Sequence, residues 1–293
     1  MDRVDMTTAV DEAVADGQSV YLPGFTHLSP FAAGHEIIRQ GYRDLTLGRM
    51  SPDLITDQLL AAGCLAGCVF SFASRGLRRA IEAGEDIETE EYTHYSLAAR
   101  LAAGARDLPF MPLRTFTGSD LPAHNPRIMT VESPYDGEEI HVVPPLEPDV
   151  TIAHVPRADE AGNAQVWGTI GEVRDAVFAA DTVVLSAEEI VDEDVTRSDP
   201  NRTVAVGSAV DYLVEEPYAA HPSYVQGHYD RDRAVYDAWR DRVDEGRVDA
   251  YLDEWVYGVE NREEYLSKLS ADRLVDLEPA TNYATPVDMG GYR

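Results

Sequence analysis

The stretch Val20-Tyr21-Leu22-Pro23-Gly24-Phe25-Thr26-His27 predicts a short apolar strand that ends in a glycine turn, and a helix pattern over residues 30–41 follows it. Such a corner gathers backbone N–H groups at a helix N-terminus, where they can hold a carboxylate, a phosphate or a developing oxyanion. The alternative is that the corner only turns the chain, as most strand, glycine and helix junctions do. Gly24, Phe25, Thr26 and His27 are therefore candidates for binding a substrate or an oxyanion.

Short β-type runs alternate with helix patterns along most of the chain. Strands are expected at residues 20–22, 45–47, 69–72, 110–113, 150–155, 182–185 and 203–206. Helices are expected at residues 5–16, 30–41, 53–62, 75–83, 93–106 and 171–179. This alternation predicts an α/β fold with a mostly parallel sheet and helices on both faces.

Two segments depart from the alternation. Residues 114–148 are rich in proline and polar turns, which indicates a small inserted lobe with short antiparallel strands. After Pro217 we expect acidic helices at 230–247 and 250–269, followed by an irregular tail from Ala271. We therefore expect one domain over residues 1–235 and a helical and irregular C-terminal extension over 236–293.

The charge of the chain is strongly negative. It has 53 acidic and 24 basic residues, a net charge of −29, and Lys268 is its only lysine. Acidity spread over the whole sequence is typical of a halophilic surface, because charge repulsion is screened within about 3 Å in molar salt. The sequence has no stripe of basic residues, so nucleic acid is not expected as a partner. No apolar run approaches the roughly 20 residues of a membrane span, and no signal-peptide pattern opens the sequence, so we expect a cytoplasmic protein.

Several common catalytic motifs are missing from the sequence. It contains no Gly-x-Ser-x-Gly elbow, no Gly-x-Gly-x-x-Gly fingerprint and no Walker loop. The eight histidines show no metal-ligand spacing, and Cys64 and Cys68 alone do not make a zinc site, so we expect two buried core thiols. We predict neither a metal nor a permanently bound cofactor.

A second cluster of polar groups stands at Glu90-Glu91-Tyr92-Thr93-His94, where the helix over 93–106 is expected to begin. Two carboxylates, a hydroxyl and an imidazole at one helix start are suited to acid and base chemistry. The alternative is that Thr93 is the N-cap and the glutamates only complement the helix dipole. Both interpretations remain open from the residues alone.

Four segments together resemble the α subunit of family I coenzyme A transferases, most closely the glutaconate CoA-transferase A-subunit branch. They are Pro23-Gly24-Phe25-Thr26 with the helix to Arg39; Glu90-Glu91-Tyr92 leading to Leu108-Pro109-Phe110-Met111-Pro112; Arg157-Ala158-Asp159 with Gly162-Asn163-Ala164; and His221-Pro222-Ser223-Tyr224-Val225-Gln226-Gly227-His228-Tyr229. The resemblance covers residues 5–235 and implies that the domain over 1–235 is a CoA-transferase α-subunit domain.

The resemblance implies covalent catalysis by a glutamate that attacks an acyl-CoA and then carries CoA as a thioester. In the family this glutamate lies in a Glu-Asn-Gly motif of the β subunit, and this chain has no such motif. We therefore expect a partner in the form of a separate β subunit, with an acyl-CoA and a free carboxylic acid as substrates. Coenzyme A is expected as a substrate and not as a resident cofactor.

The resemblance also suggests roles for single residues. The amides of Gly24 and Phe25 would stabilise an oxyanion or a substrate carboxylate, at about 3 kcal/mol per donor. His94 stands where relatives of the 3-oxoacid type have a glutamine, so it would donate to the thioester carbonyl or act as a general base in a hydrolytic variant. Asn163 would bind substrate or brace the site, and Ser119 would bind substrate from a loop that faces the partner chain.

Two other functions fit the same fold. Some relatives hydrolyse a ring C–C bond of a cyclic-diketone CoA thioester, and here Glu90 or Glu91 would be the base. A non-catalytic module that senses a CoA ester or a sugar phosphate is the third hypothesis, because the same architecture hosts isomerases and regulators.

Overall fold

The computed structural model describes residues 1–279 and is built around a long parallel sheet. The strand order is β1-β13-β11-β9-β2-β3-β4-β5, and every neighbouring pair along this path is parallel. The bounds are β1 Asp2–Arg3, β2 Ser19–Tyr21, β3 Leu45–Arg49, β4 Leu65–Phe70, β5 Glu88–Glu91, β9 Val150–Asp159, β11 Thr182–Val191 and β13 Tyr212–Glu215. The α/β prediction is confirmed.

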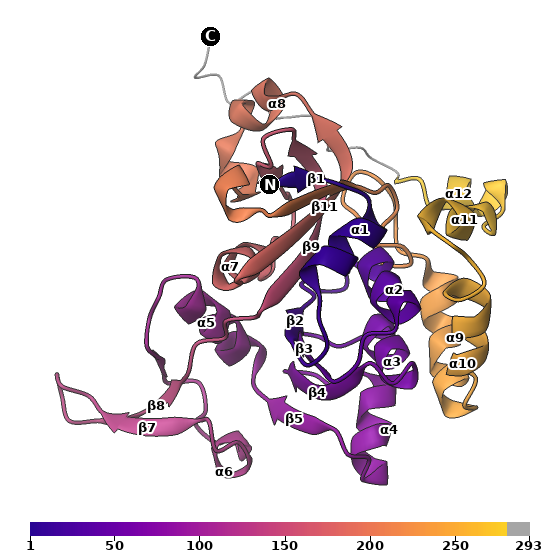
Figure 1. Cartoon of the computed structure of the whole chain (residues 1–293). Helices are drawn as coiled ribbons and strands as arrows, with labels where there is room; N and C mark the ends of the chain where they lie inside the picture. Colours follow the sequence, from indigo (N-terminus) through magenta and orange to yellow (C-terminus); the bar gives the residue numbers. More distant parts are fainter. Residues whose placement is uncertain (280–293) are drawn as a thin grey trace.

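Helices cover both faces of this sheet (Figure 1). One layer holds α1 Met6–Ala13, α2 Phe31–Gln40, α3 Leu54–Ala61 and α4 Arg75–Ala83. The opposite face carries α5 His94–Gly104 and α7 Val173–Ala179, which contact each other. β9 is buried along its whole length, and this cover on both faces explains why most of its first six residues, Val150 to Val155, are apolar.

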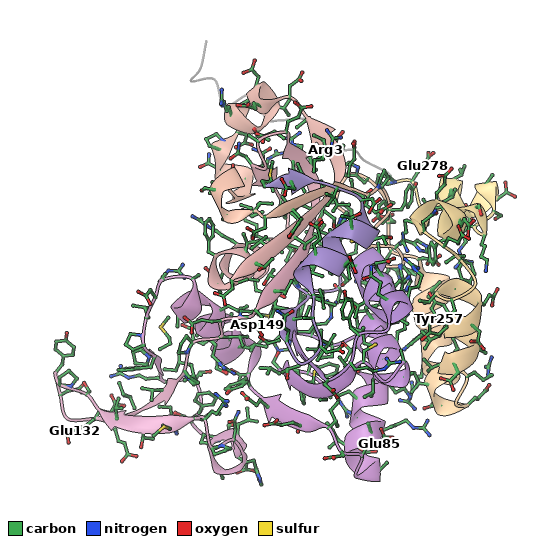
Figure 2. All side chains as sticks on the ribbon, viewed as in Figure 1. Arg3, Glu85, Glu132, Asp149, Tyr257 and Glu278 are labelled. Carbon is green, nitrogen blue, oxygen red and sulfur yellow. The ribbon has the colours of Figure 1, made fainter. Side chains whose placement is uncertain are left out.

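Short strands outside the main path form two smaller features. A lobe extends from the body as the antiparallel sheet β6-β8-β7, with β6 Met111–Leu113, β7 Met129–Glu132, β8 Glu139–Val143 and the short helix α6 Leu121–His124. Figure 2 labels Glu132 at the outer part of this lobe. The expected antiparallel strands are confirmed, but the strand expected at 110–113 belongs to the lobe and not to the main sheet, because it pairs with β8. Beside β9, the strands β10 Ala164–Gln165 and β12 Thr203–Ala205 pair antiparallel, and α8 Glu193–Ser198 lies next to them.

The end of the chain adds a third helical layer next to α3 and α4 (Figure 1). It contains α9 Arg233–Asp244, α10 Val248–Trp255, α11 Arg262–Ser267 and α12 Ala271–Asp276. The irregular tail expected from Ala271 is thus wrong for residues 271–276, which are helical, and residues 280–293 lie outside the described part. Trp239, Tyr251 and Leu252 belong to the same buried cluster as Phe31 and Ile55 of α2 and α3. The boundary drawn at residue 235 stays a prediction.

The strands β5 and β13 were not expected from the sequence. The four residues of β5, Glu-Thr-Glu-Glu, contain no apolar side chain, and the strand lies at the edge of the sheet with its side chains largely exposed. Its backbone pairs with β4, and this pairing makes it a strand although its sequence has no apolar pattern.

Cys64 and Cys68 are buried as expected, and burial raises the pKa of Cys68 to about 12.

Candidate active site

The corner after β2 is a loop over residues 22–30 and not the first turn of a helix. The helix α2 begins only at Phe31, whose N–H donates to the Ser29 carbonyl at 2.8 Å, while the Ala32 N–H donates to the Ala219 carbonyl at 2.9 Å. The expectation that the Gly24 and Phe25 amides lie at a helix N-terminus is therefore wrong. The loop lies instead at the carboxyl edge of the parallel sheet, where ligands of open α/β sheets bind.

The backbone conformation of the loop requires a glycine at position 24. Gly24 has φ +119°, and a Cβ added there would lie 2.6 Å from the His27 carbonyl oxygen. Its N–H donates to the carboxylate of Glu172, a buried side chain, at 3.2 Å. In this conformation the Gly24 amide is occupied. No group among residues 1–279 accepts a hydrogen bond from the Phe25 N–H, so this amide is one of the donors that the corner can offer to a ligand.

His27 and Thr26 hold the loop in place. The buried His27 ring has Nδ1 at 2.6 Å from the Phe25 carbonyl and Nε2 at 2.6 Å from the Thr169 carbonyl, so both nitrogens are engaged. Thr26 has a left-handed backbone with φ 60°, and its carbonyl accepts from Ser223 Oγ at 3.1 Å and from Arg231 Nη2 at 2.9 Å. These contacts give His27 a bracing role and leave its ring without a free nitrogen for substrate.

Arg49, at the end of β3, is the main anchor beneath the loop and was missed in the sequence. Its side chain is fully buried. It donates from Nη1 to the Leu22 carbonyl at 2.8 Å, and from Nη2 to Ser29 Oγ at 2.6 Å and Asp53 Oδ2 at 2.9 Å. One guanidinium thereby joins both ends of the loop to the start of α3, which makes the corner rigid. The sequence signal for this anchoring role is an arginine at the end of the strand over residues 45–49.

The second candidate segment lies directly against this corner. The exposed ring of His94, the first residue of α5, meets the ring of Phe25 edge to face with centroids 5.4 Å apart. Thr93 caps α5, and it forms a capping box with Ser96, so the interpretation of Thr93 as N-cap is confirmed. Two segments almost 70 residues apart in the sequence are thus brought together at one exposed edge.

The two candidate glutamates of β5, Glu90 and Glu91, differ in their surroundings. The carboxylate of Glu90 contacts Arg100 at 3.0 Å and Arg127 at 2.8 Å, and it accepts from the Tyr92 hydroxyl at 3.1 Å. The side chain of Glu91 is exposed and forms no hydrogen bond or ion pair with any residue of the described chain. Glu90 is therefore a structural anion, and Glu91 is the carboxylate that remains accessible.

Asn163 and Ser119 are not brought to the corner. The Asn163 side chain donates to Asp159 at 2.9 Å and accepts weakly from the Gly207 N–H at 3.4 Å, which closes the turn after β9. In β9, Asp159 lies eight residues beyond Thr151, the residue that pairs with Tyr21 of β2, or about 26 Å along the strand. Ser119 lies in the lobe, where its Oγ accepts from the Leu121 N–H at 3.3 Å at the start of α6. A substrate role for either residue stays a prediction.

Neither a metal site nor a membrane span is evident within residues 1–279. No group of three or more His, Cys, Asp or Glu side chains in this range is arranged to hold a metal ion. No helix in the same range has both the length and the apolar character needed to cross a bilayer.

The family profile described as "Coenzyme A transferase" matches residues 3–216. The chain belongs to the coenzyme A transferase family. Among relatives of this transferase chain, the A-subunit of the 3-oxoadipate CoA-transferase of Pseudomonas knackmussii is 41% identical over 275 residues, which cover 89% of this chain and 96% of the relative. The A-subunit of the glutaconate CoA-transferase of Acidaminococcus fermentans is 30% identical over 308 residues, covering 96% of each chain.

Solved structures support the same assignment. The crystal structure of the Acidaminococcus fermentans glutaconate coenzyme A-transferase matches with a TM-score of 0.91 and 28% identity over 99% of both chains. A further relative is the cholesterol ring-cleaving hydrolase IpdA subunit of Mycobacterium tuberculosis, 32% identical over 251 residues that cover 78% of this chain and 85% of the relative. The transferase chain is thus homologous to the corresponding subunits of two CoA-transferases.

Proposed function

We propose that this chain is the α subunit of a CoA-transferase that moves CoA between an acyl-CoA and a free carboxylic acid. The glutamate nucleophile comes from a separate β subunit. The observation that carries the proposal is the contact between Phe25 and His94 at an exposed edge, where both residues can donate hydrogen bonds. The nearby Glu90 carboxylate is already paired with two arginines. This edge is suited to stabilise charge, and in the proposal the attacking carboxylate is the glutamate of the β subunit.

In the proposed reaction, the partner glutamate attacks the thioester carbonyl, and the C=O electrons move onto oxygen as the new C–O bond forms. Collapse expels CoA thiolate and leaves a mixed anhydride. The thiolate then attacks the glutamyl carbonyl, releases the first acid as a carboxylate and forms the enzyme–CoA thioester, and an acceptor carboxylate reverses these steps. The Phe25 amide and His94 would stabilise the oxyanion, at about 3 kcal/mol for a well-placed donor.

The acyl group that we propose carries a second carboxylate. This proposal rests on the names of the two transferase relatives, because 3-oxoadipate and glutaconate are both dicarboxylates. A panel of dicarboxylic and monocarboxylic acyl-CoA esters of equal chain length tests it, and equal kcat/KM values for the two series would contradict it.

Hydrolysis is the second candidate, favoured by the accessible carboxylate of Glu91 and by the similarity to the ring-cleaving hydrolase subunit. In this reaction Glu91 would act as a general base for water, with His94 as its neighbour. The two functions differ in the bond that is broken: the transferase moves CoA from the thioester to an acid, whereas the hydrolase would add water across a ring C–C bond and leave the thioester intact.

The test is to co-produce the chain with the protein encoded beside it and to follow exchange of CoA between labelled esters and free acids. A transferase is expected to exchange CoA, and borohydride is expected to trap the thioester on the partner's glutamate. His94→Ala should lower kcat at least tenfold, while the matched variant His94→Gln should retain a donor and most of the activity. Hydrolysis without exchange, abolished by Glu91→Gln, would favour the second candidate.

A further inference from the structure

The C-terminal helical layer contains a pocket of its own (Figure 1). It encloses about 360 Å³ between α9, α10, α11 and the turn that leads into α12, which is within the roughly 300–1,000 Å³ of ordinary ligand sites. Neither the loop over residues 22–30 nor His94 contributes to its lining. The pocket is therefore separate from the corner described above.

This pocket is basic although the chain is strongly acidic. Arg242, Lys268 and Arg273 line it, whereas no Asp or Glu of residues 1–279 does, in a chain whose net charge is −29. His221 also lines the pocket, and burial lowers its pKa, so its ring is neutral at neutral pH and adds no charge. A cleft lined by charge of one sign concentrates ions of the opposite sign, so this pocket favours an anion.

Two of the three cations are available to a ligand. Arg273 is held by the Asp232 carboxylate at 2.6 and 2.5 Å. The Arg242 side chain has neither a hydrogen bond nor an ion pair within residues 1–279. The Lys268 ammonium has three donors and gives one of them to the Glu254 carbonyl. An anion in the pocket can thus accept from Arg242 and Lys268.

Aromatic rings form the apolar wall of the pocket and hold both cations. The Arg242 guanidinium lies 5.2 Å from the ring centroid of Tyr251, and Lys268 Nζ lies 5.6 Å from that of Trp255. The Trp255 ring also stacks on Tyr251 and meets Tyr265 edge to face, with centroids 6.2 and 5.3 Å apart. Because the rings restrain the cations, an anion loses less entropy in ordering them. An aromatic acid matches both features, since its carboxylate meets the cations and its ring packs on the wall.

The pocket ends against residues 221–232, the bracing loop. The Tyr265 hydroxyl, in the pocket wall, lies 2.8 Å from His221 Nδ1, and His221 Nε2 lies 3.0 Å from the Asp232 carboxylate. The Asp232 N–H donates to the Pro222 carbonyl at 3.0 Å and closes the loop at its base. A ligand on the pocket wall therefore rests on the base of the bracing loop.

The bracing loop in turn holds the corner. Its Ser223 hydroxyl and its Arg231 guanidinium both donate to the Thr26 carbonyl, at 3.1 and 2.9 Å. The Leu28 N–H of the corner donates to the Tyr224 carbonyl of the bracing loop at 3.0 Å. Any opening of the bracing loop breaks these contacts, so the order of the corner depends on the order of this loop.

We propose that this pocket is an effector site for an aromatic carboxylate, and that binding there restrains the corner through the bracing loop. Arg242 and Lys268 bind the carboxylate, and the ring of the ligand packs on Trp255. The pocket wall is complete only while the bracing loop is in place, so a bound ligand stabilises the closed form of the loop. The site is independent of the reaction at the corner and goes beyond the proposed function.

The binding test uses naphthalene-2-carboxylate and calorimetry with the full chain at constant ionic strength. Arg242→Gln and Lys268→Gln should each weaken binding about tenfold. The matched control is Arg240→Gln on the same helix, an exposed arginine that also has no ion pair within residues 1–279 but does not line this pocket. Binding that is absent, or equal in all variants, would overturn the site.

Two further probes separate the charge from the ring. The neutral naphthalene-2-carboxamide and the ringless acetate should each bind at least about tenfold more weakly than naphthalene-2-carboxylate, because each lacks one of the two features. Equal affinity of the acid and the amide would contradict an anion site.

A filling variant tests the position of the ligand without removing a charge. Ala238 lines the pocket from α9 and is exposed, so Ala238→Phe should occupy the cavity and abolish binding while both cations stay in place. An unchanged affinity would place the ligand elsewhere and overturn the proposal.

Hydrogen exchange tests the link to the corner. Saturation with naphthalene-2-carboxylate should slow exchange of the amides of residues 22–30 severalfold, whereas β7 in the lobe should exchange at an unchanged rate. At the same concentration Arg242→Gln should show a smaller effect at the corner. Binding without slower exchange at residues 22–30 would overturn the effector role.

Discussion

Replacing Arg49 by methionine is expected to cost more stability than any exposed substitution in this chain. The change removes donors from three groups, the Leu22 carbonyl, the Ser29 hydroxyl and the Asp53 carboxylate, at 2.8, 2.6 and 2.9 Å. Each acceptor left without a partner costs about 1–3 kcal/mol, and breaking a buried ion pair from one side costs about 3–5 kcal/mol. Because the three losses share one side chain and are not additive, we expect about 3–5 kcal/mol.

The assay is urea unfolding at constant salt, with Arg3→Met as the control. Arg3 (Figure 2) pairs with Glu215 at 2.6 Å, but both side chains are nearly half exposed, so its loss should cost about 0–1 kcal/mol. In an Asp53→Asn background the Arg49→Met cost should fall by about 1–2 kcal/mol, because the orphaned charge is gone. Equal costs for Arg49→Met and Arg3→Met would refute the anchoring role of Arg49.

The remaining predictions concern the corner, the pH dependence and the salt dependence. Gly24→Ala should destabilise by about 2–3 kcal/mol because of its φ of +119° and a backbone clash at 2.6 Å, whereas Gly17→Ala, with nothing within 4 Å, should cost about 1 kcal/mol, both measured by urea unfolding. A double-mutant cycle of Phe25→Ala and His94→Ala should give a coupling of about 0.5–1.5 kcal/mol, and additive losses would argue against the ring contact. Burial raises the pKa of Asp57 to about 6 from 3.8, so the native state keeps a proton that the unfolded chain loses between these values. The unfolding free energy should therefore fall as pH rises across this interval and then level off, and Asp57→Asn should flatten that slope. The melting temperature should drop in dilute buffer, and an unchanged value would count against a halophilic surface.

The parallel core could be predicted because its strands carry their own signal. The run Val150-Thr151-Ile152-Ala153-His154-Val155 is apolar enough to require cover on both faces, and β9 is buried throughout. The edge strand β5 has no such signal, since pairing with β4 and not its own side chains makes it a strand. Pairing across the sheet depends on the assembled fold and cannot be obtained from four residues.

The candidate site was predicted in parts and not as a whole. Phe25 and His94 were each selected from a local pattern, and the structure brings their rings within 5.4 Å. The residues that hold the corner, Arg49 and Glu172, lie 25 and 148 positions from Gly24 and carry no local motif. For the same reason the availability of each amide could not be predicted, because it depends on which distant side chain accepts from it.

The core of the amino-terminal half is completed by the last part of the chain. Trp239 of α9 and Tyr251 of α10 pack into the cluster that holds Phe31 and Ile55, and β1 at the start of the chain pairs with β13. A chain emerging from the ribosome thus exposes this apolar surface until more than 250 residues have been made. We expect the order of synthesis to hold back folding, since contacts between distant positions form late. Newly made chains should therefore depend on chaperones more than a protein of this size whose first half folds by itself.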